Sequence, residues 1–345
     1  MSPAVVLLVA VAISCVAAAH LLAGAAWPRR SPAVAIALWQ ALGLSWGVAT
    51  VGALAGFGAS GLRGRAAAAG GGLTSVASAA TKAARLMLGA AGTARRWDVM
   101  TTLRFASLIA GILLLALLCW ILIAAVTAVL RARHRQRALL GLLAHDDPKV
   151  PGALVVDYPA AAAYCVPGLR SAIVISAGTL DLLDQAELAA VLAHERAHLR
   201  ARHDLVLLPF TALLRAFRWS AIARDANREV ALLVEMMADD RARRRRPARE
   251  LATALLRVGA SGGGLAPTGA LAVGGITGDV HAEGSGSGAA SAGGSPGQTM
   301  DGELAARVTR LLRPPPGLPV TAAILVGAVA AGLVAAPALA MLLPL

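Results

Sequence analysis

Four long apolar stretches constrain this chain more than any other feature. They run from Pro3 to Ala26, from Ala33 to Phe57, from Leu103 to Leu130 and from Pro319 to Leu343. Each reaches the roughly 20 residues that a helix needs to cross a bilayer. Hydrophobic residues make up 57% of the chain, which is more than soluble proteins of this length usually contain. The sequence therefore predicts a mainly α-helical, multi-pass protein of the cell membrane with four transmembrane helices in a lipid bilayer.

Basic residues flank these stretches unevenly and predict an orientation. Four arginines lie from Arg131 to Arg137, directly after the third stretch, and two more, Arg29 and Arg30, lie between the first two stretches. Because basic residues near the ends of spans tend to stay in the cytoplasm, we expect the N-terminus outside and residues 131–318 in the cytoplasm. The connection 58–102 is also basic and would lie outside, although long connections obey the rule less strictly.

A metal-binding motif, His194-Glu195-Arg196-Ala197-His198, lies in the expected cytoplasmic segment. In a helix its two histidines are one turn apart on the same face, so both can bind one Zn²⁺, while Glu195 is placed to act as general base on a water molecule. A capping-box pattern, Asp184 to Glu187, predicts where that helix begins. Apolar residues then follow at helical spacing: Leu188, Val191, Leu192 and Leu199. These features favour a hydrolytic zinc site over a solvated, charged helix face.

A catalytic zinc site needs a third protein ligand and one open position. The helix expected from about Asp225 to Arg243 offers Glu235 and Glu229. Glu235 is favoured because Asp239, one turn later, can hydrogen-bond a metal ligand from outside the coordination shell, but spacing alone does not exclude Glu229. His203 lies five residues past His198 and so off the metal-facing side, where a supporting or solvent-facing role is expected.

Three short β-prone runs precede the motif: residues 154–158, 162–166 and 172–176. Turn residues Pro167-Gly168 separate the last two, and we expect a small antiparallel sheet followed by the motif helix. An exposed edge of this sheet could bind an extended peptide or could belong to a merely stabilising hairpin, and the sequence does not separate these readings. The apolar run 205–217 is too short to span a bilayer.

The segments around the motif differ sharply in composition. Six arginines between Arg241 and Arg249 form a basic cluster, for which we favour attraction to anionic lipid over nucleic-acid binding, because no nucleic-acid-binding fold is recognisable. Residues 259–302, which include His281, are rich in Gly, Ser and Ala and predict a flexible linker without metal ligands. Residues 79–90 have the pattern of an amphipathic helix on the membrane surface.

These patterns divide the chain into five parts. We expect a three-helix membrane region over residues 1–130, a cytoplasmic zinc metallopeptidase domain over 131–258, the flexible linker over 259–302, a short helix (Glu303 to Leu312) with a proline-rich lead-in over 303–318, and a transmembrane helix over 319–345.

The chain resembles the integral-membrane zinc metallopeptidases of the BlaR/MecR family, whose best-known members are β-lactam sensor-transducers. The resemblance is densest from Ala163 to Asp240. There the chain contains, in the family's order, A-Y-C-V-P-G, I-V-I-S, H-E-x-x-H with its closing His-Asp, and E-x-x-A-D. The motif R-V-T-R-L-L follows later, before the prolines. It implies an α+β, gluzincin-like protease domain with His194, His198 and Glu235 as zinc ligands and Glu195 as base. Sensor-transducers carry a penicillin-binding domain after the last span, whereas this sequence stops at Leu345 and has no S-x-x-K sensor chemistry, so we expect a short, sensorless relative.

Two functional readings follow. The first is a regulatory membrane endopeptidase that cuts a cytoplasmic or membrane-adjacent protein, by family analogy a transcriptional repressor. The alternative is a quality-control protease of the HtpX type, which shares H-E-x-x-H and E-x-x-A-D. A catalytically silent scaffold is disfavoured because Glu195 is present. Zinc is the expected cofactor, a protein or peptide is the expected substrate, and no direct nucleic-acid contact is expected.

Overall fold

The computed structural model describes residues 2–68, 99–168, 171–261, 264–265 and 296–342. The chain is mainly helical and forms two compact units. The first, which we call the membrane unit, comprises residues 1–18, 40–119 and 328–345, and the second, which we call the sheet unit, comprises residues 19–39 and 120–327. The expected amphipathic helix at 79–90 and His281 lie outside the described residues.

Among the residues that the structure describes, four helices are long and apolar enough to cross a membrane: α1 (Pro3–Ala23), α2 (Pro32–Ala68, apolar through Ser60), α4 (Val99–Leu143) and α11 (Val320–Leu342). Each coincides with one of the four predicted stretches. The side of the membrane that each end faces stays a prediction.

Small residues let the helices of the membrane unit approach closely. Leu8 of α1 packs with alanines of α2 and α11 in a buried cluster. Gly58 of α2 lies directly against α4, where an added Cβ would be 2.5 Å from the Cβ of Leu108. Nearby, the Ser107 hydroxyl donates a hydrogen bond of 2.9 Å to the carbonyl of Leu54. Close packing of this kind, rather than large apolar side chains, is typical of helix pairs in membranes.

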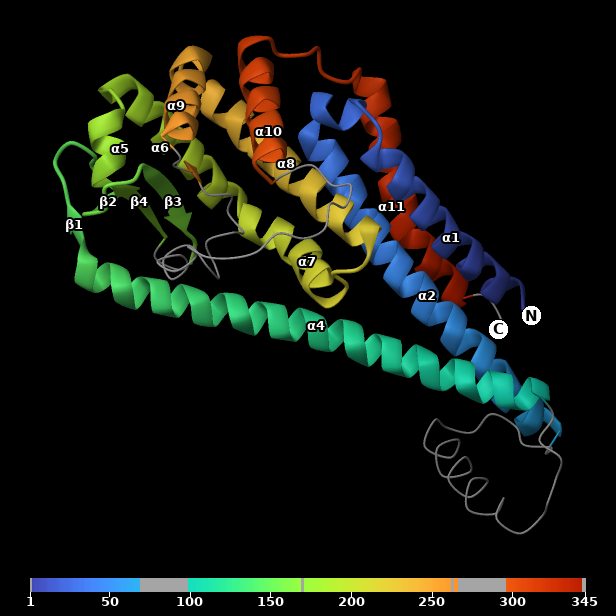
Figure 1. Ribbon diagram of the computed structural model, residues 1–345. Coiled ribbons are helices and arrows are strands. Elements are labelled where there is room, and N and C mark those ends of the chain that lie inside the picture. Colours follow the sequence, from blue (N-terminus) through green and yellow to red (C-terminus); the bar gives the residue numbers. More distant parts are fainter. Residues whose placement is uncertain (1, 69–98, 169–170, 262–263, 266–295, 343–345) are drawn as a thin grey trace, which may run out of the picture. The chain divides into compact units, whose positions relative to one another are not determined.

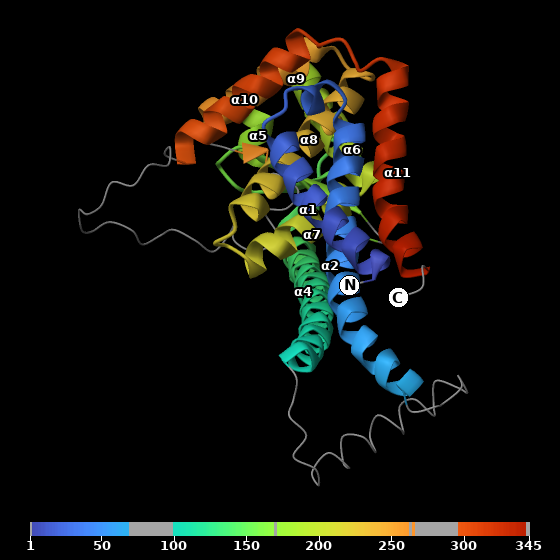
Figure 2. The ribbon, with the colours of Figure 1, turned by 90° about the vertical axis from the view of Figure 1, so that its right-hand side faces the viewer.

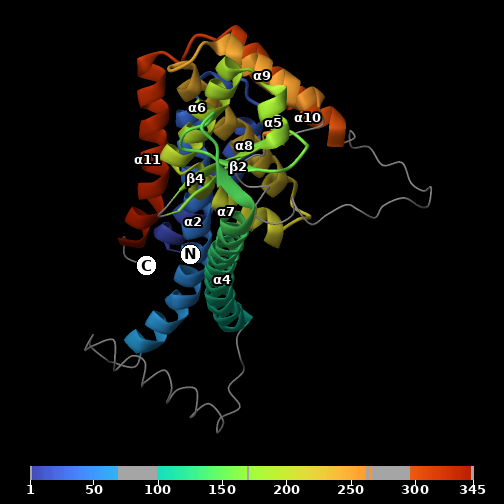
Figure 3. The same cartoon turned by 90° about the vertical axis from the view of Figure 1, so that its left-hand side faces the viewer.

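The helix α4 links the two units along the chain. Its 45 residues correspond to about 68 Å at 1.5 Å per residue, which is more than the roughly 30 Å of a bilayer's hydrocarbon core. Its C-terminal part carries the Arg131 to Arg137 cluster and leads directly into β1 of the sheet unit, as Figures 1 and 3 show. Within that unit Arg133 forms an ion pair with Asp204, and Arg137 donates to the carbonyl of Pro167.

Within its described residues, the sheet unit contains a five-stranded sheet with the order β1-β2-β4-β3-β5. The strands are β1 (Ala144–Asp146), β2 (Leu154–Val156), β3 (Ala162–Val166), β4 (Ala172–Ser176) and β5 (Gly264–Leu265). The β3–β4 pair is antiparallel, as expected, with Tyr164 opposite Val174. The expectation of a purely antiparallel sheet is wrong, however, because β2 pairs in parallel with β4 and β5 pairs in parallel with β3. The residues after β2 cross over so that β3 joins β4 from its other side.

Besides the ends of the long helices, the described part of this unit contains these helical segments: η1 (Trp27–Arg30), α5 (Ala177–Leu182), α6 (Gln185–Ala201), α7 (His203–Ala216), α8 (Ala221–Arg243), α9 (Ala248–Ala260) and α10 (Pro296–Leu312). The central helix is α6, which packs on β3 and β4 and also on α8 and α9. Its Leu188 and Val191 join Ile173 and Ile175 of the sheet in the main apolar core. Figures 1 and 2 show α10 lying beside α9, which it contacts closely.

Parts of the expected linker have regular structure. Helix α9 continues to Ala260, residues 264–265 form β5, and α10 begins at Pro296 rather than at Glu303. A strand pairing uses backbone groups and therefore needs no apolar side chains, and proline is well tolerated in the first turn of a helix. The amino-acid composition of this segment therefore did not indicate β5 or the beginning of α10. The remaining linker residues lie outside the described part.

Candidate metal centre

The motif helix α6 begins where the capping box was predicted. The Asp184 carboxylate accepts hydrogen bonds of 2.9 Å from the backbone N–H groups of Ala186 and Glu187, and the Glu187 carboxylate accepts one of 3.1 Å from the N–H of Asp184. These bonds satisfy N–H groups that have no partner within the helix. The helix ends at Arg202, whose φ of 48° is in the left-handed region. This conformation turns the chain sharply into α7, which begins at His203.

Both motif histidines point from α6 toward α8 and are buried. Their Nε2 atoms are 3.0 Å apart, as expected for residues one helical turn apart on one face. Because both nitrogens are directed at the same place, the pair provides two imidazole donors for one ion.

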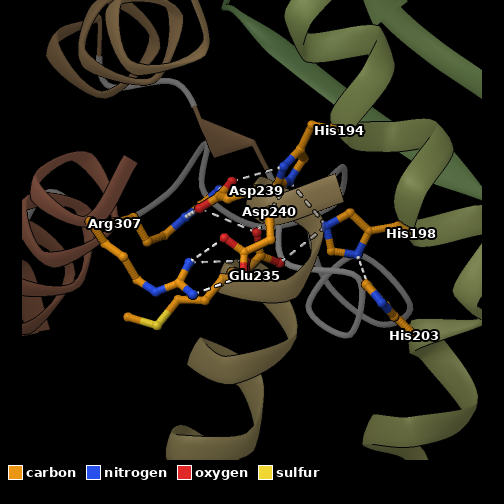
Figure 4. A network of polar contacts seen from close by, with 9 residues as sticks. His194, His198, His203, Glu235, Asp239, Asp240 and Arg307 are labelled. Atoms are coloured by element: carbon orange, nitrogen blue, oxygen red, sulfur yellow. Dashed lines mark hydrogen bonds and ion pairs between the residues drawn. The ribbon is translucent and has the colours of Figure 1, made fainter. Parts of the chain in front are cut away.

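The third group comes from α8, which Ser220 caps by accepting a hydrogen bond from the N–H of Ala223. The Glu235 carboxylate oxygens lie 3.4 Å from the Nε2 of His194 and 3.7 Å from the Nε2 of His198 (Figure 4). Donor atoms of these three residues all lie within 4.8 Å of one another. Among the described residues, Glu229 is not part of this group. The packing of α8 on α6 thus favours Glu235 over Glu229 as the third ligand, a choice that sequence spacing left open.

Polar partners hold the other nitrogen of each histidine ring. The Nδ1 of His194 is 3.0 Å from a carboxylate oxygen of Asp239. The Nδ1 of His198 is 2.9 Å from the Nδ1 of His203, whose Nε2 in turn lies 2.9 Å from a guanidinium nitrogen of Arg241. Contacts of this kind fix the orientation of metal-binding imidazoles. His203 therefore has the supporting position expected for it. Arg241, a member of the basic cluster, contacts another residue of the protein through this bond to His203.

The electrostatics of the cluster favour ionised carboxylates on α8. Burial opposes the ionisation of Glu235, but His198 and Arg307 outweigh it and hold the pKa of Glu235 well below its usual range. Burial likewise opposes the ionisation of Asp239, but the guanidinium of Arg307 lowers its pKa to about 2. Burial disfavours a charged His194, yet Asp239 and Glu235 raise its pKa to about 10. The side chains of this cluster thus favour positive charge at the site.

Glu195 lies on the same helix, directly after His194. Its side chain is buried, and the nearby thiol of Cys165 on β3 acts to lower its pKa. Burial raises the pKa of Glu195, although the two motif histidines oppose that shift. Burial and the nearby Glu195 together raise the pKa of the Cys165 thiol, so it stays protonated. A carboxylate whose pKa is moved toward neutrality is suited to accept a proton and later release it.

The residue that sequence reasoning missed is Arg307 on α10. Its guanidinium donates two hydrogen bonds, of 2.9 and 2.8 Å, to the two carboxylate oxygens of Asp239, and it lies 3.2 Å from Glu235. Leu304, Val308 and Leu311 on the same helix pack on apolar residues. An arginine within an apolar stripe at helical spacing is the signal that could have identified it, because such an arginine is buried only when it is paired.

The donor chemistry fits zinc. Two imidazole nitrogens and one carboxylate are a donor set of catalytic zinc sites, and the cluster combines three buried carboxylates, those of Glu195, Glu235 and Asp239, with one buried guanidinium. A divalent cation would compensate this excess of negative charge. His194, His198 and Glu235 are the residues that would hold it.

The comparisons with known proteins agree with this chemistry. Residues 130–240 match the model of peptidase family M48, and no curated protein or solved structure matches the chain. The matched segment contains the motif helix, Glu235 and Asp239, and it ends before α9 and α10. Members of this family are zinc metallopeptidases, and residues 130–240 are therefore a peptidase M48 family domain.

Proposed function

We propose that this chain is a membrane-bound zinc metalloendopeptidase. The observation that carries the proposal is the convergence of His194, His198 and Glu235 within 4.8 Å beside Glu195, which lies between the two histidines in sequence. A structural zinc site would use four protein ligands. The described residues provide three such donors at this place, which leaves one coordination position for water and substrate.

The proposed reaction is the hydrolysis of a peptide bond. Bound zinc would supply a Lewis acid that makes water more acidic and polarises the peptide carbonyl. The Glu195 carboxylate accepts a proton from the attacking water as the C–O bond forms. It then donates that proton to the amide nitrogen as the C–N bond breaks, so that a carboxylate and an amine are released. Asp239 and His203 keep the two histidine rings in place throughout.

The substrate we propose is a cytoplasmic protein or a cytoplasmic loop of a membrane protein. The basic Arg131 to Arg137 cluster supports a cytoplasmic site. The resemblance to the BlaR/MecR family supports a regulatory role, with a transcriptional repressor as substrate. A quality-control role of the HtpX type is the alternative, since it uses the same metal motif. Co-expression with a repressor encoded by a neighbouring gene distinguishes them: site-specific cleavage supports regulation, whereas cleavage of misfolded membrane proteins alone supports quality control.

The catalytic proposal is tested by substituting Glu195 with Gln in the full chain. Because the ligands remain while the base is lost, we expect zinc content to stay near that of the wild type and proteolysis of an unfolded substrate protein to fall by about 100-fold or more. Glu229→Gln, on α8 outside the donor group, is the matched control and should cleave normally. Undiminished cleavage by zinc-loaded Glu195→Gln protein would overturn the proposed mechanism.

The orientation is tested by impermeant cysteine labelling of intact cells. Single cysteines are placed at Ser287, which lies outside the described residues, and at the C-terminal Leu345, in a chain without native cysteines. We expect labelling at position 345 only. Labelling at position 287 would place the sheet unit outside the cytoplasm and would exclude a cytoplasmic substrate.

A further inference from the structure

Helix α10 brings one guanidinium into the centre of the acidic cluster. Arg307 is 8% exposed and contacts both acidic side chains that α8 contributes to the site. Its fork of two parallel N–H donors matches the two oxygens of Asp239, a geometry that fixes the carboxylate plane as well as its position. The segment that provides this contact lies outside residues 130–240.

The two carboxylates that Arg307 contacts also contact the metal-binding ring of His194. One oxygen of Asp239 accepts from Arg307 at 2.8 Å and is 3.0 Å from the Nδ1 of His194. One oxygen of Glu235 is 3.2 Å from Arg307 and 3.4 Å from the Nε2 of His194. Without a cation between them, the two negatively charged carboxylates of Asp239 and Glu235 would repel each other. The guanidinium therefore holds both in the orientation that His194 requires.

The helix that carries Arg307 is itself fixed against the motif helix. Leu311 of α10 is buried in one cluster with Ala190 and Ala193 of α6, the latter being the residue just before His194. A side chain anchored in this way loses little additional entropy when it forms its ion pairs. The guanidinium is thus placed by packing before any metal binds.

We propose that Arg307 is a positioning residue of the metal centre, which orients Asp239 and Glu235 so that His194 and Glu235 can bind the ion together. This inference rests on the proposed function because it concerns the same site. It assigns to α10, a helix beyond the matched family segment, a role in metal binding rather than in packing alone.

The competing explanation is that Arg307 merely attaches α10 to α8. The chain offers a matched control, because Arg310, one turn later on α10, forms two hydrogen bonds of 2.7 Å with Asp240 of α8. Arg310 is thus also paired with an acidic residue of the same helix, but Asp240 is not part of the metal-binding group. Losing Arg310 removes its hydrogen bonds to Asp240 and to the carbonyls of Arg29 and Met236. Only the loss of Arg307 removes contacts to Glu235 and Asp239.

The experiment measures zinc affinity by competition with a chelator for the full chain and for the variants Arg307→Met, Arg307→Lys and Arg310→Met. We expect Arg307→Met to lose about 10-fold to 100-fold in affinity, the magnitude typical of residues that orient metal ligands. Arg307→Lys keeps the charge without the fork and should lose less. Arg310→Met should stay within about 2-fold of the wild type. If Arg307→Met does not fold, the lysine variant carries the test.

A spectroscopic readout separates positioning from general destabilisation. In Co²⁺-substituted protein, the visible bands report ligand geometry, and we expect them to change in Arg307→Lys but not in Arg310→Met. Equal zinc affinities and equal spectra for the two positions would overturn the positioning role while leaving the peptidase proposal intact. A wild-type chain that binds no zinc would instead overturn the proposed function.

Discussion

The capping box of α6 allows a stability change to be predicted from local structure. Replacing Asp184 with Ala removes the acceptor for two backbone N–H groups, those of Ala186 and Glu187. The first of these N–H groups is exposed and can bind water instead, whereas the second is partly buried. The reciprocal bond from the Glu187 carboxylate to the backbone N–H of residue 184 can persist, because that N–H is retained. We therefore expect a loss of about 1 kcal/mol in the free energy of unfolding, near the middle of the range for lost caps.

The assay is thermal unfolding of the purified chain at saturating zinc, so that metal content is constant. A loss of about 1 kcal/mol corresponds to a fall of roughly 2 to 4 °C in Tm for a unit of this size. Asp184→Asn, which retains an acceptor, should fall by much less. Asp181→Ala alters an exposed acidic residue of the preceding helix α5 and serves as control. A Tm for Asp184→Ala equal to that of Asp181→Ala would refute the capping argument.

Two further predictions follow from other contacts. His203→Phe preserves much of the ring volume but removes the 2.9 Å contact to His198, so we expect zinc affinity to fall by roughly 10-fold in a chelator competition; an unchanged affinity would refute the role of His203 in orienting His198. In the membrane unit, Gly58→Ala brings a methyl group within 2.5 Å of the Cβ of Leu108 and should destabilise the chain by about 1 to 3 kcal/mol, measured by unfolding in detergent. Gly43→Ala, where a Cβ would meet nothing within 4 Å, is the control and should not be destabilising.

Features encoded within a short window were predictable from the sequence. The four apolar helices need only length and composition. The start of α6 depends on four consecutive residues from Asp184 to Glu187. The two motif histidines follow from helical periodicity, and so does the displacement of His203 from the metal-facing side.

Features that depend on distant segments were not predictable in this way. Helical spacing alone does not specify which face of α8 meets α6, so the preference for Glu235 over Glu229 came from the neighbouring Asp239 and not from periodicity. The parallel pairing of β2 with β4 was missed because consecutive β-prone runs suggest hairpins. Arg307 was missed because its partner Asp239 is 68 residues away in the chain. Only the packing of α10 brings the two together.

The central claim is that His194, His198 and Glu235 form a catalytic zinc site. It is tested most directly by determining the zinc content and the X-ray absorption spectrum of purified Glu195→Gln protein, in which the metal ligands remain and self-cleavage is prevented. We predict about one zinc per chain with two imidazole ligands at roughly 2.0 to 2.1 Å. The imidazole signal should weaken in a second variant that also carries His198→Ala. Absence of stoichiometric zinc, or a zinc spectrum unchanged by His198→Ala, would contradict the account.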